Sequence, residues 1–264
     1  MIDRQTKGRT SPGRLRALDA YLLEAERPLL LAPPPAAAFV DVGFGEHPFT
    51  TLESARALRA VHPSLPVLGL DRDPARAAAA QPHADGPTRF SEGGFEALAD
   101  LGPLRIVRAM NVLRTYREAE VSTAHALLGA HLMEGGLALE GSADPEGAIL
   151  TCHLLRRRGE TLHREALLFF TDFSHGFAPL LFRDWLPRDL RRRVVPGEPI
   201  HAFFTAWTQA WSQVREAAPD PRAAFTASAQ TLATRLPGVE ADPRWTSRGY
   251  LLYRPPSGIP QPRP

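Results

Sequence analysis

Short apolar runs alternate with amphipathic helical stretches through the first half of the chain. Residues 39–42, 67–71, 104–108 and 137–140 are typical of buried strands, and a stretch such as 118–133 carries apolar side chains at helical spacing. This order indicates parallel strands joined by helices that cover both faces of a sheet. We therefore expect an α/β fold whose sheet is seven-stranded and mostly parallel.

The pattern changes after residue 147. Two strand-like runs, 148–155 and 162–170, flank an arginine-rich turn, so the sheet is expected to end in an antiparallel hairpin. Helical patterns follow at 201–217 and 223–236, and a last short strand is expected at 250–253. The predicted organisation is a helical lead-in (1–35), a core that would hold the ligand (36–175), a mainly helical extension (176–254) and a disordered tail (255–264).

Composition limits the class of protein. The 264 residues carry a formal charge of +2, and Lys7 is the only lysine, so the many arginines reflect the composition of a GC-rich bacterial genome better than a nucleic-acid surface. No apolar run approaches the length of a membrane span. Cys152 is the only cysteine, which excludes an internal disulfide. We expect a cytoplasmic monomer or homodimer, with no membrane or nucleic-acid partner.

The most informative local motif is a glycine turn directly after the first strand. In Phe-Val-Asp-Val-Gly-Phe-Gly, residues 39–45, glycine allows close approach of a ligand to the backbone at the start of a helix. Asp41 lies inside the strand, where a carboxylate suits a ligand with an ammonium group and repels a pyrophosphate. Pro48 stands where a dinucleotide fingerprint would have its third glycine.

A second carboxylate ends the next strand. Asp71 is placed to accept hydrogen bonds from the ribose hydroxyls of an adenosine. The alternative is a helix cap ahead of Pro74, a role that Asp73 would serve equally well.

Together these residues resemble a known family. Residues 39–140 are similar to class I S-adenosylmethionine-dependent methyltransferases, with 39–45 as the first motif, 67–71 as the second and 106–113 as the fourth. Asp-Val-Gly-Phe-Gly from Asp41, Arg-Ala-Met-Asn-Val-Leu-Arg from Arg108 and Val-Pro-Gly-Glu from Val195 resemble an uncharacterised bacterial branch. The resemblance implies a Rossmann-like methyltransferase fold with S-adenosylmethionine as cofactor.

The resemblance also implies site residues. The cofactor would be held by Asp41, Gly43, Phe44, Gly45, Asp71, Arg72, Glu92, Gly93, Gly94, Phe95 and Asn111. The acceptor would lie at the carboxyl ends of the strands, near Glu46, Arg108 and Arg114. Asn111, His47 and Tyr116 are the candidate catalytic residues, with Asn111 facing the donor methyl and His47 as a possible base.

Other features are interpreted as structural. Phe204, Trp207 and Trp211 form an aromatic stripe typical of packing, although they could roof a substrate site. His153 and His163 fall on the two strands of the hairpin, but no third ligand stands out, so no metal site is expected.

Two alternatives stay open from the sequence. A nicotinamide-dependent oxidoreductase would use the same kind of sheet, although Asp41 and the missing third glycine count against it. A methyltransferase-like fold could also bind a ligand without catalysis. Asp41→Ala is expected to abolish cofactor binding and leave the fold intact.

Overall fold

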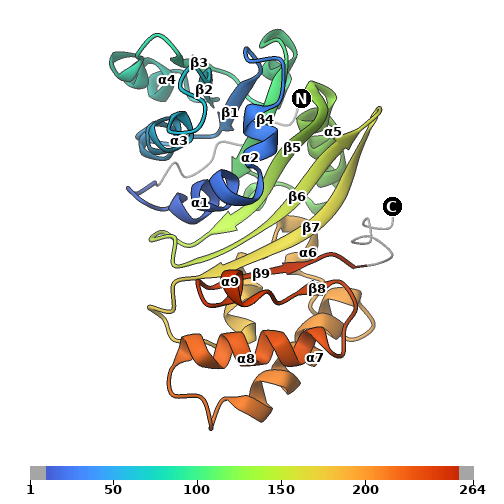
Figure 1. Cartoon of the computed structure of the whole chain (residues 1–264). Coiled ribbons are helices and arrows are strands. Elements are labelled where there is room, and N and C mark those ends of the chain that lie inside the picture. Colours follow the sequence, from blue (N-terminus) through green and yellow to red (C-terminus); the bar gives the residue numbers. More distant parts are fainter. Residues whose placement is uncertain (1–9, 256–264) are drawn as a thin grey trace.

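The computed structural model describes residues 10–255 of the chain. A single nine-stranded sheet runs through it, in the order β3-β2-β1-β4-β5-β6-β7-β9-β8 (Figure 1). The strands are β1 (Ala38–Val42), β2 (Val67–Asp71), β3 (Thr88–Glu92), β4 (Leu104–Met110), β5 (Leu132–Ala143), β6 (Ile149–Arg158), β7 (Thr161–Thr171), β8 (Val239–Glu240) and β9 (Tyr250–Tyr253).

The first five strands form a parallel, Rossmann-like half-sheet. β1 pairs with β2 and β4, β2 also pairs with β3, and β4 also pairs with β5, all in parallel. The chain builds outward from β1 to β3 and then returns to place β4 on the other side of β1. The strand order therefore reverses between β1 and β4, where sheets of this kind bind their ligands.

The second half of the sheet is antiparallel. β6 pairs with β5 and β7, and β9 joins β7 and β8. The expected hairpin is present, but the count of seven strands is wrong. The apolar strand β9 pairs with the edge of β7 that would otherwise stay open, and β8 pairs with β9 as the last strand of the sheet.

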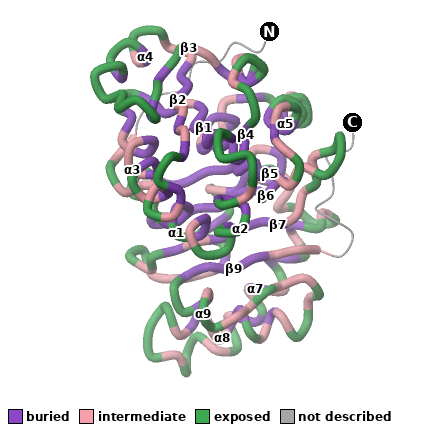
Figure 2. The backbone as a smooth tube through the Cα atoms, turned by 45° about the horizontal axis from the view of Figure 1, so that its top comes forward, coloured by how far each residue is buried: buried purple, intermediate pink, exposed green. Residues whose placement is uncertain are grey.

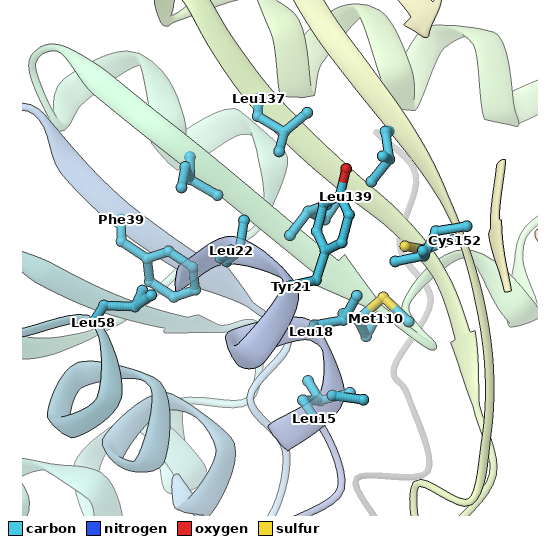
Figure 3. Close-up of a cluster of buried hydrophobic side chains, with 14 of the residues drawn as sticks. Leu15, Leu18, Tyr21, Leu22, Phe39, Leu58, Met110, Leu137, Leu139 and Cys152 are labelled. Carbon is cyan, nitrogen blue, oxygen red and sulfur yellow. The ribbon is translucent and has the colours of Figure 1, made fainter. Parts of the chain in front are cut away.

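Helices cover both faces of this sheet. One face carries α1 (Arg16–Ala25), α2 (Arg27–Leu31) and α3 (Phe49–Arg59). Figure 3 shows Leu18, Tyr21 and Leu22 of α1 in one apolar cluster with Phe39, Met110 and Leu139 of the strands. The helices on the other face are α5 (Val121–Ala130), against the parallel half, and α7 (Pro199–Val214) with α8 (Pro221–Ala233), beneath β7 and β9. The remaining helices are α4 (Pro74–Ala80), α6 (Arg188–Arg191) and α9 (Pro243–Thr246), with short 3-10 turns η1 (Gln81–His83), η2 (Phe95–Asp100), η3 (Leu113–Thr115), η4 (Glu118–Glu120) and η5 (Pro179–Trp185).

Burial follows this layering. The central strands are buried along most of their length, whereas the outward sides of the helices and most connections are exposed (Figure 2). The aromatic stripe of α7 is packing at Phe204 and Trp207, which are buried against Phe169 of β7. Within residues 10–255, no helix has the length and apolarity needed to cross a membrane.

Two local expectations are corrected. The helical lead-in expected within residues 1–35 is divided at Glu26, because Pro28 fits only in the first turn of a new helix. The helical stretch expected at 118–133 ends earlier, at Ala130, and the strand β5 already begins at Leu132. Of the tail predicted at 255–264, residues 256–264 lie outside the described residues.

Candidate functional site

A cavity of about 540 Å³ opens at the carboxyl ends of β1 and β4, where the strand order reverses. This volume lies in the range of small-molecule sites. It is lined by Thr10, Arg14, Leu15, Asp41, Gly43, Phe44, Gly45, Thr50, Met110, Asn111, Arg114, Thr115, Pro145 and Trp185. Five of the fourteen, Asp41, Gly43, Phe44, Gly45 and Asn111, were predicted to hold a cofactor, and Arg114 was predicted to hold an acceptor.

The glycine turn forms one wall of this cavity. Gly43 has φ +75° and Gly45 has φ +88°, backbone conformations that residues with a side chain rarely adopt. The Gly43 N–H donates to the carbonyl of Leu70 at 2.6 Å, which ties the turn to the end of β2. Phe44 turns its ring inward onto Phe90, with 5.4 Å between centroids, so the aromatic side chain anchors the turn.

Beneath the cavity floor, Asp41 forms a bidentate ion pair with Arg108. Nε of Arg108 donates to Oδ1 of Asp41 at 2.9 Å, and Nη2 donates to Oδ2 at 2.8 Å. Thr51 and Thr50 donate to the same Oδ2, at 2.7 and 3.3 Å. Asp41 is only 3% exposed, so its carboxylate meets the cavity from below and already has a cationic partner.

Arg108 has no donor left for a substrate. Nη1 donates to Asp19 and to Ser54, and the second N–H of Nη2 reaches the carbonyl of Thr50. With the two bonds to Asp41, all five N–H groups of the guanidinium are used, and the side chain is fully buried. The prediction that Arg108 holds an acceptor is therefore wrong, because the residue is internal.

A second carboxylate gives this buried cluster an excess of negative charge. Burial raises the pKa of Asp19 to about 6, although Arg108 and Ser54 act to lower it. Nearby Asp41 and Glu53 raise it further. Above about pH 6, two carboxylates face one guanidinium, and the cluster carries one net negative charge below the cavity.

The shifted pKa of Asp19 predicts a pH dependence of stability. Because the folded-state pKa lies above the ordinary value of 3.8, its contribution is full below pH 3.8 and is lost as the pH rises through 6. Compared with Asp19→Asn, the native chain should lose about 1 kcal/mol of unfolding free energy between pH 5 and pH 7.5. Urea unfolding of both proteins at the two pH values measures this difference, and parallel stability curves would contradict it.

The opposite wall of the cavity is cationic. Arg114 lies over the ring of Trp185 at 4.7 Å and donates to the carbonyl of Asp184 at 3.3 Å. Arg14 donates to the carbonyls of Asp144 and Ala143 at 2.8 and 2.7 Å. Burial lowers the pKa of both guanidinium groups. Repulsion by the positive charges of Arg191 and Arg14 lowers the pKa of Arg114 further.

Asn111 sits between the two walls in a strained conformation. Its φ of 62° is rare for a residue with a side chain, and such strain is concentrated at functional positions. The Asn111 N–H donates to the carbonyl of Gly141 at 2.7 Å, and Oδ1 accepts from the N–H of Ala143 at 3.2 Å. These bonds hold the residue at the cavity with its amide oxygen turned toward β5.

The residues predicted to hold an adenosine do not line this cavity. Asp71 is 3% exposed, and its carboxylate accepts the N–H groups of Gly45 and Asp73 at 2.9 and 3.0 Å. Asp73 caps α4, as the alternative interpretation allowed. The ribose role of Asp71 stays a prediction and requires that the turn at Gly45 open.

A surface ion pair lies over the predicted adenine turn. Arg72 reaches Glu96 at 2.6 Å, and a Cβ built on Gly94 would lie 2.2 Å from Nε of Arg72. Glu92 is exposed, and Phe95 is buried against Tyr116. The roles of Arg72, Glu92, Gly93, Gly94 and Phe95 therefore also remain predictions.

Three further candidates lie away from the cavity lining. Tyr116 is 2% exposed and belongs to the core beside Phe95, which argues against a catalytic contact. Glu46 and His47 are exposed, and the His47 ring packs on Phe49 with 5.1 Å between centroids. The structure does not bring these three residues to the cavity with Asn111.

Sequence reasoning missed several lining residues. Thr10, Arg14 and Leu15 come from the start of the chain, and Pro145 and Trp185 follow later strands. Nothing in their local sequence marks them, because they reach the site only through packing. For Arg108, a signal was present: a charged residue in the middle of a buried strand needs an internal partner.

No protein-family model matches the chain, and no curated protein sequence matches it. Magnesium protoporphyrin IX methyltransferase from Synechocystis PCC 6803, solved with bound SAH, is 22% identical with a TM-score of 0.37. The alignment covers 48% of this chain and 53%, about half, of that one.

Two other solved structures are similar over comparable regions. An amino pentose methyltransferase of calicheamicin biosynthesis from Micromonospora echinaspora, with bound SAM, is 22% identical with a TM-score of 0.37, covering 62% of this chain and 70% of that one. A pericyclic reaction enzyme is 18% identical with a TM-score of 0.35, covering 53% and 34%.

Proposed function

We propose that this chain binds S-adenosylmethionine and transfers its methyl group to a small-molecule acceptor. The observation that carries the proposal is the cavity at the reversal point between β1 and β4, lined by Asp41, Gly43 and Asn111. Ligands of open α/β sheets bind at this position, outside the carboxyl ends of the strands.

The charges around the cavity fit an amino-acid group. The Asp41 and Asp19 carboxylates exceed the single charge of Arg108, so the floor favours an ammonium. Arg14 and Arg114 on the other wall favour a carboxylate. A zwitterion such as the methionine portion of the cofactor matches both, whereas a pyrophosphate would meet the negative floor.

The chemistry requires alignment more than proton transfer. When bound, the cofactor would supply a methyl group on a sulfonium as the electrophile, with the neutral thioether as the leaving group when the acceptor atom bonds to the methyl carbon. The residues of this chain hold the donor at the glycine turn, position Asn111 beside it and exclude water. Since His47 and Tyr116 lie outside the cavity, no base is assigned to them here.

The acceptor would enter beside Arg114 and Trp185. Trp185, Met110 and Leu15 add apolar surface to the same cavity, and Arg114 adds a positive charge. This combination supports an acceptor with an apolar body and an anionic group, bound near Asn111.

Ligand-dependent stabilisation tests the proposal. At a concentration of S-adenosylhomocysteine 100 times its dissociation constant, the unfolding free energy should rise by about 2.7 kcal/mol. NAD and L-methionine are titrated in parallel on the same protein. Stabilisation by NAD alone would favour the oxidoreductase and overturn the proposal, as would the absence of any effect of S-adenosylhomocysteine in a folded sample.

A second candidate function is supported by the contacts that already occupy the residues predicted to bind the adenosine. Asp71 is engaged with Gly45, and Arg72 lies over Gly94, so the cavity accommodates the amino-acid end of a ligand more readily than its nucleoside. A non-catalytic protein that binds a small zwitterion would have this form. It predicts equal stabilisation by L-methionine and S-adenosylhomocysteine in the same titration.

A further inference from the structure

A second buried polar cluster lies on the opposite face of the sheet from Asp41. Nε2 of His153 on β6 is 3.0 Å from Oδ1 of Asp189 on α6. Nε2 of His125 on α5 is 3.1 Å from Oε2 of Glu140 on β5. Glu140 and His153 are directly paired across β5 and β6, so the sheet register itself brings the two pairs together.

Arg164 on β7 connects these two pairs. Its Nη1 lies 2.5 Å from Oδ2 of Asp189, and its Nη2 lies 3.4 Å from Nδ1 of His125. An arginine N–H can only donate, so Nδ1 of His125 accepts and its Nε2–H donates to Glu140. This arrangement assigns a neutral imidazole to His125.

Carboxylates outnumber permanent cations in this cluster. With neutral imidazoles, Glu140 and Asp189 supply two negative charges against the single charge of Arg164. Glu140, His153 and Asp189 are each at most 1% exposed, so water does not compensate the excess. An uncompensated buried charge is strongly unfavourable, which favours the uptake of a cation.

An unused nitrogen adds an independent observation. Nδ1 of the fully buried His153 has no hydrogen-bond partner among residues 10–255. One ligand atom each from Glu140, His153 and Asp189 can be chosen so that all three lie within 4.8 Å of one another. The third ligand that the sequence did not reveal for His153 is thus Asp189, from a segment 36 residues away.

We propose that Glu140, His153 and Asp189 form a binding site for a divalent transition-metal ion such as Zn²⁺. The nitrogen and oxygen donor set suits this class of metal. His125 is the nearest source of a fourth ligand.

The surroundings supply the outer hydrogen bonds and an entry path. Arg164 donates to Oδ2 of Asp189, as partners of ligating carboxylates do, and Oδ1 of Asp189 lies 3.0 Å from Nε2 of His153. A separate cavity of about 550 Å³ is lined by His125 and Arg164 and reaches the edge of the cluster. The metal would join β5 and β6 to α6 and so fasten the C-terminal extension to the sheet.

Metal binding to the intact chain tests the site. Protein stripped with a chelator is titrated with Co²⁺, which reports its coordination through visible d–d absorption, and then with Zn²⁺. We expect one Co²⁺ per chain, displaced by one Zn²⁺, and a melting temperature higher by several degrees in the zinc-loaded protein. Absence of binding in a stripped sample that retains its native circular dichroism would overturn the proposal.

Matched variants locate the bound ion. His153→Gln and Glu140→Gln should lose stoichiometric binding, with the affinity for Co²⁺ lowered at least 10-fold. His163→Gln, on the exposed end of β7, should bind as the native chain does. His175→Gln is the second control, because Asp144, Glu146 and His175 also lie close together at the surface. Binding that follows His175 and survives His153→Gln assigns the ion elsewhere and rejects the site.

Discussion

Arg108→Met should destabilise the chain by about 3–5 kcal/mol. Methionine can fill much of the space between β1 and α3, but it leaves the carboxylate of Asp41 buried and without its cationic partner. Only the hydroxyls of Thr50 and Thr51 would then donate to Asp41. Equilibrium unfolding in urea at pH 7.5, where Asp19 is also ionised, measures the loss.

Arg105→Met is the matched control. Arg105 lies three residues earlier on the same strand and is equally buried, but its hydrogen bonds go to the carbonyls of Leu29, Ala32, Pro34 and Ala37. Its removal leaves unpaired dipoles and no unpaired charge, so a smaller loss of about 1–3 kcal/mol is expected. An Arg105→Met variant that loses more stability than Arg108→Met would contradict the charge argument.

A double variant separates charge from packing. Asp41→Asn removes the charge that Arg108→Met leaves unpaired. The loss of unfolding free energy in the double variant should therefore be smaller than the sum of the losses in the two single variants. Asp41→Ala would remove two hydrogen bonds of Arg108 and leave Asp19 as its remaining carboxylate partner, so we expect a loss of stability where the sequence led us to expect an intact fold.

The ion pair of Asp41 and Arg108 combines a position that local sequence predicts with a partner that it does not. The position of Asp41 at the end of a buried strand is a local property, and the alternation of apolar runs predicted it. Its partner lies 67 residues further along the chain and reaches it through the pairing of β1 with β4. Register across a parallel sheet is set by crossover connections and packing, which local periodicity does not encode.

The same limit applies to the edges of the fold. The parallel half and the antiparallel hairpin were predictable because each strand has its own apolar pattern. The run at 250–253 was also predicted as a strand, but its pairing with β7 depends on α7 and α8 lying beneath the sheet. The nine-stranded count and the contribution of Trp185 to the cavity follow from that packing.

The glycine turn provides the sharpest functional test, through Gly43→Ala. A Cβ at residue 43 would lie 2.7 Å from Cγ2 of Val112, and the φ of +75° is unfavourable for alanine. Val112 would have to move, and it directly follows Asn111 at the other side of the cavity. We expect the affinity for S-adenosylhomocysteine, measured by calorimetry, to fall at least 10-fold, which corresponds to about 1.4 kcal/mol.

Gly102→Ala separates this effect from backbone strain. Gly102 has the same φ of +75°, but a Cβ there would meet no heavy atom within 4 Å, and the residue does not line the cavity. Both variants therefore bear a similar backbone penalty of roughly 1 kcal/mol in unfolding free energy. Only Gly43→Ala should weaken the ligand, because only it disturbs the walls that meet between β1 and β4. Equal affinities of the two variants would mean that the ligand binds away from the glycine turn.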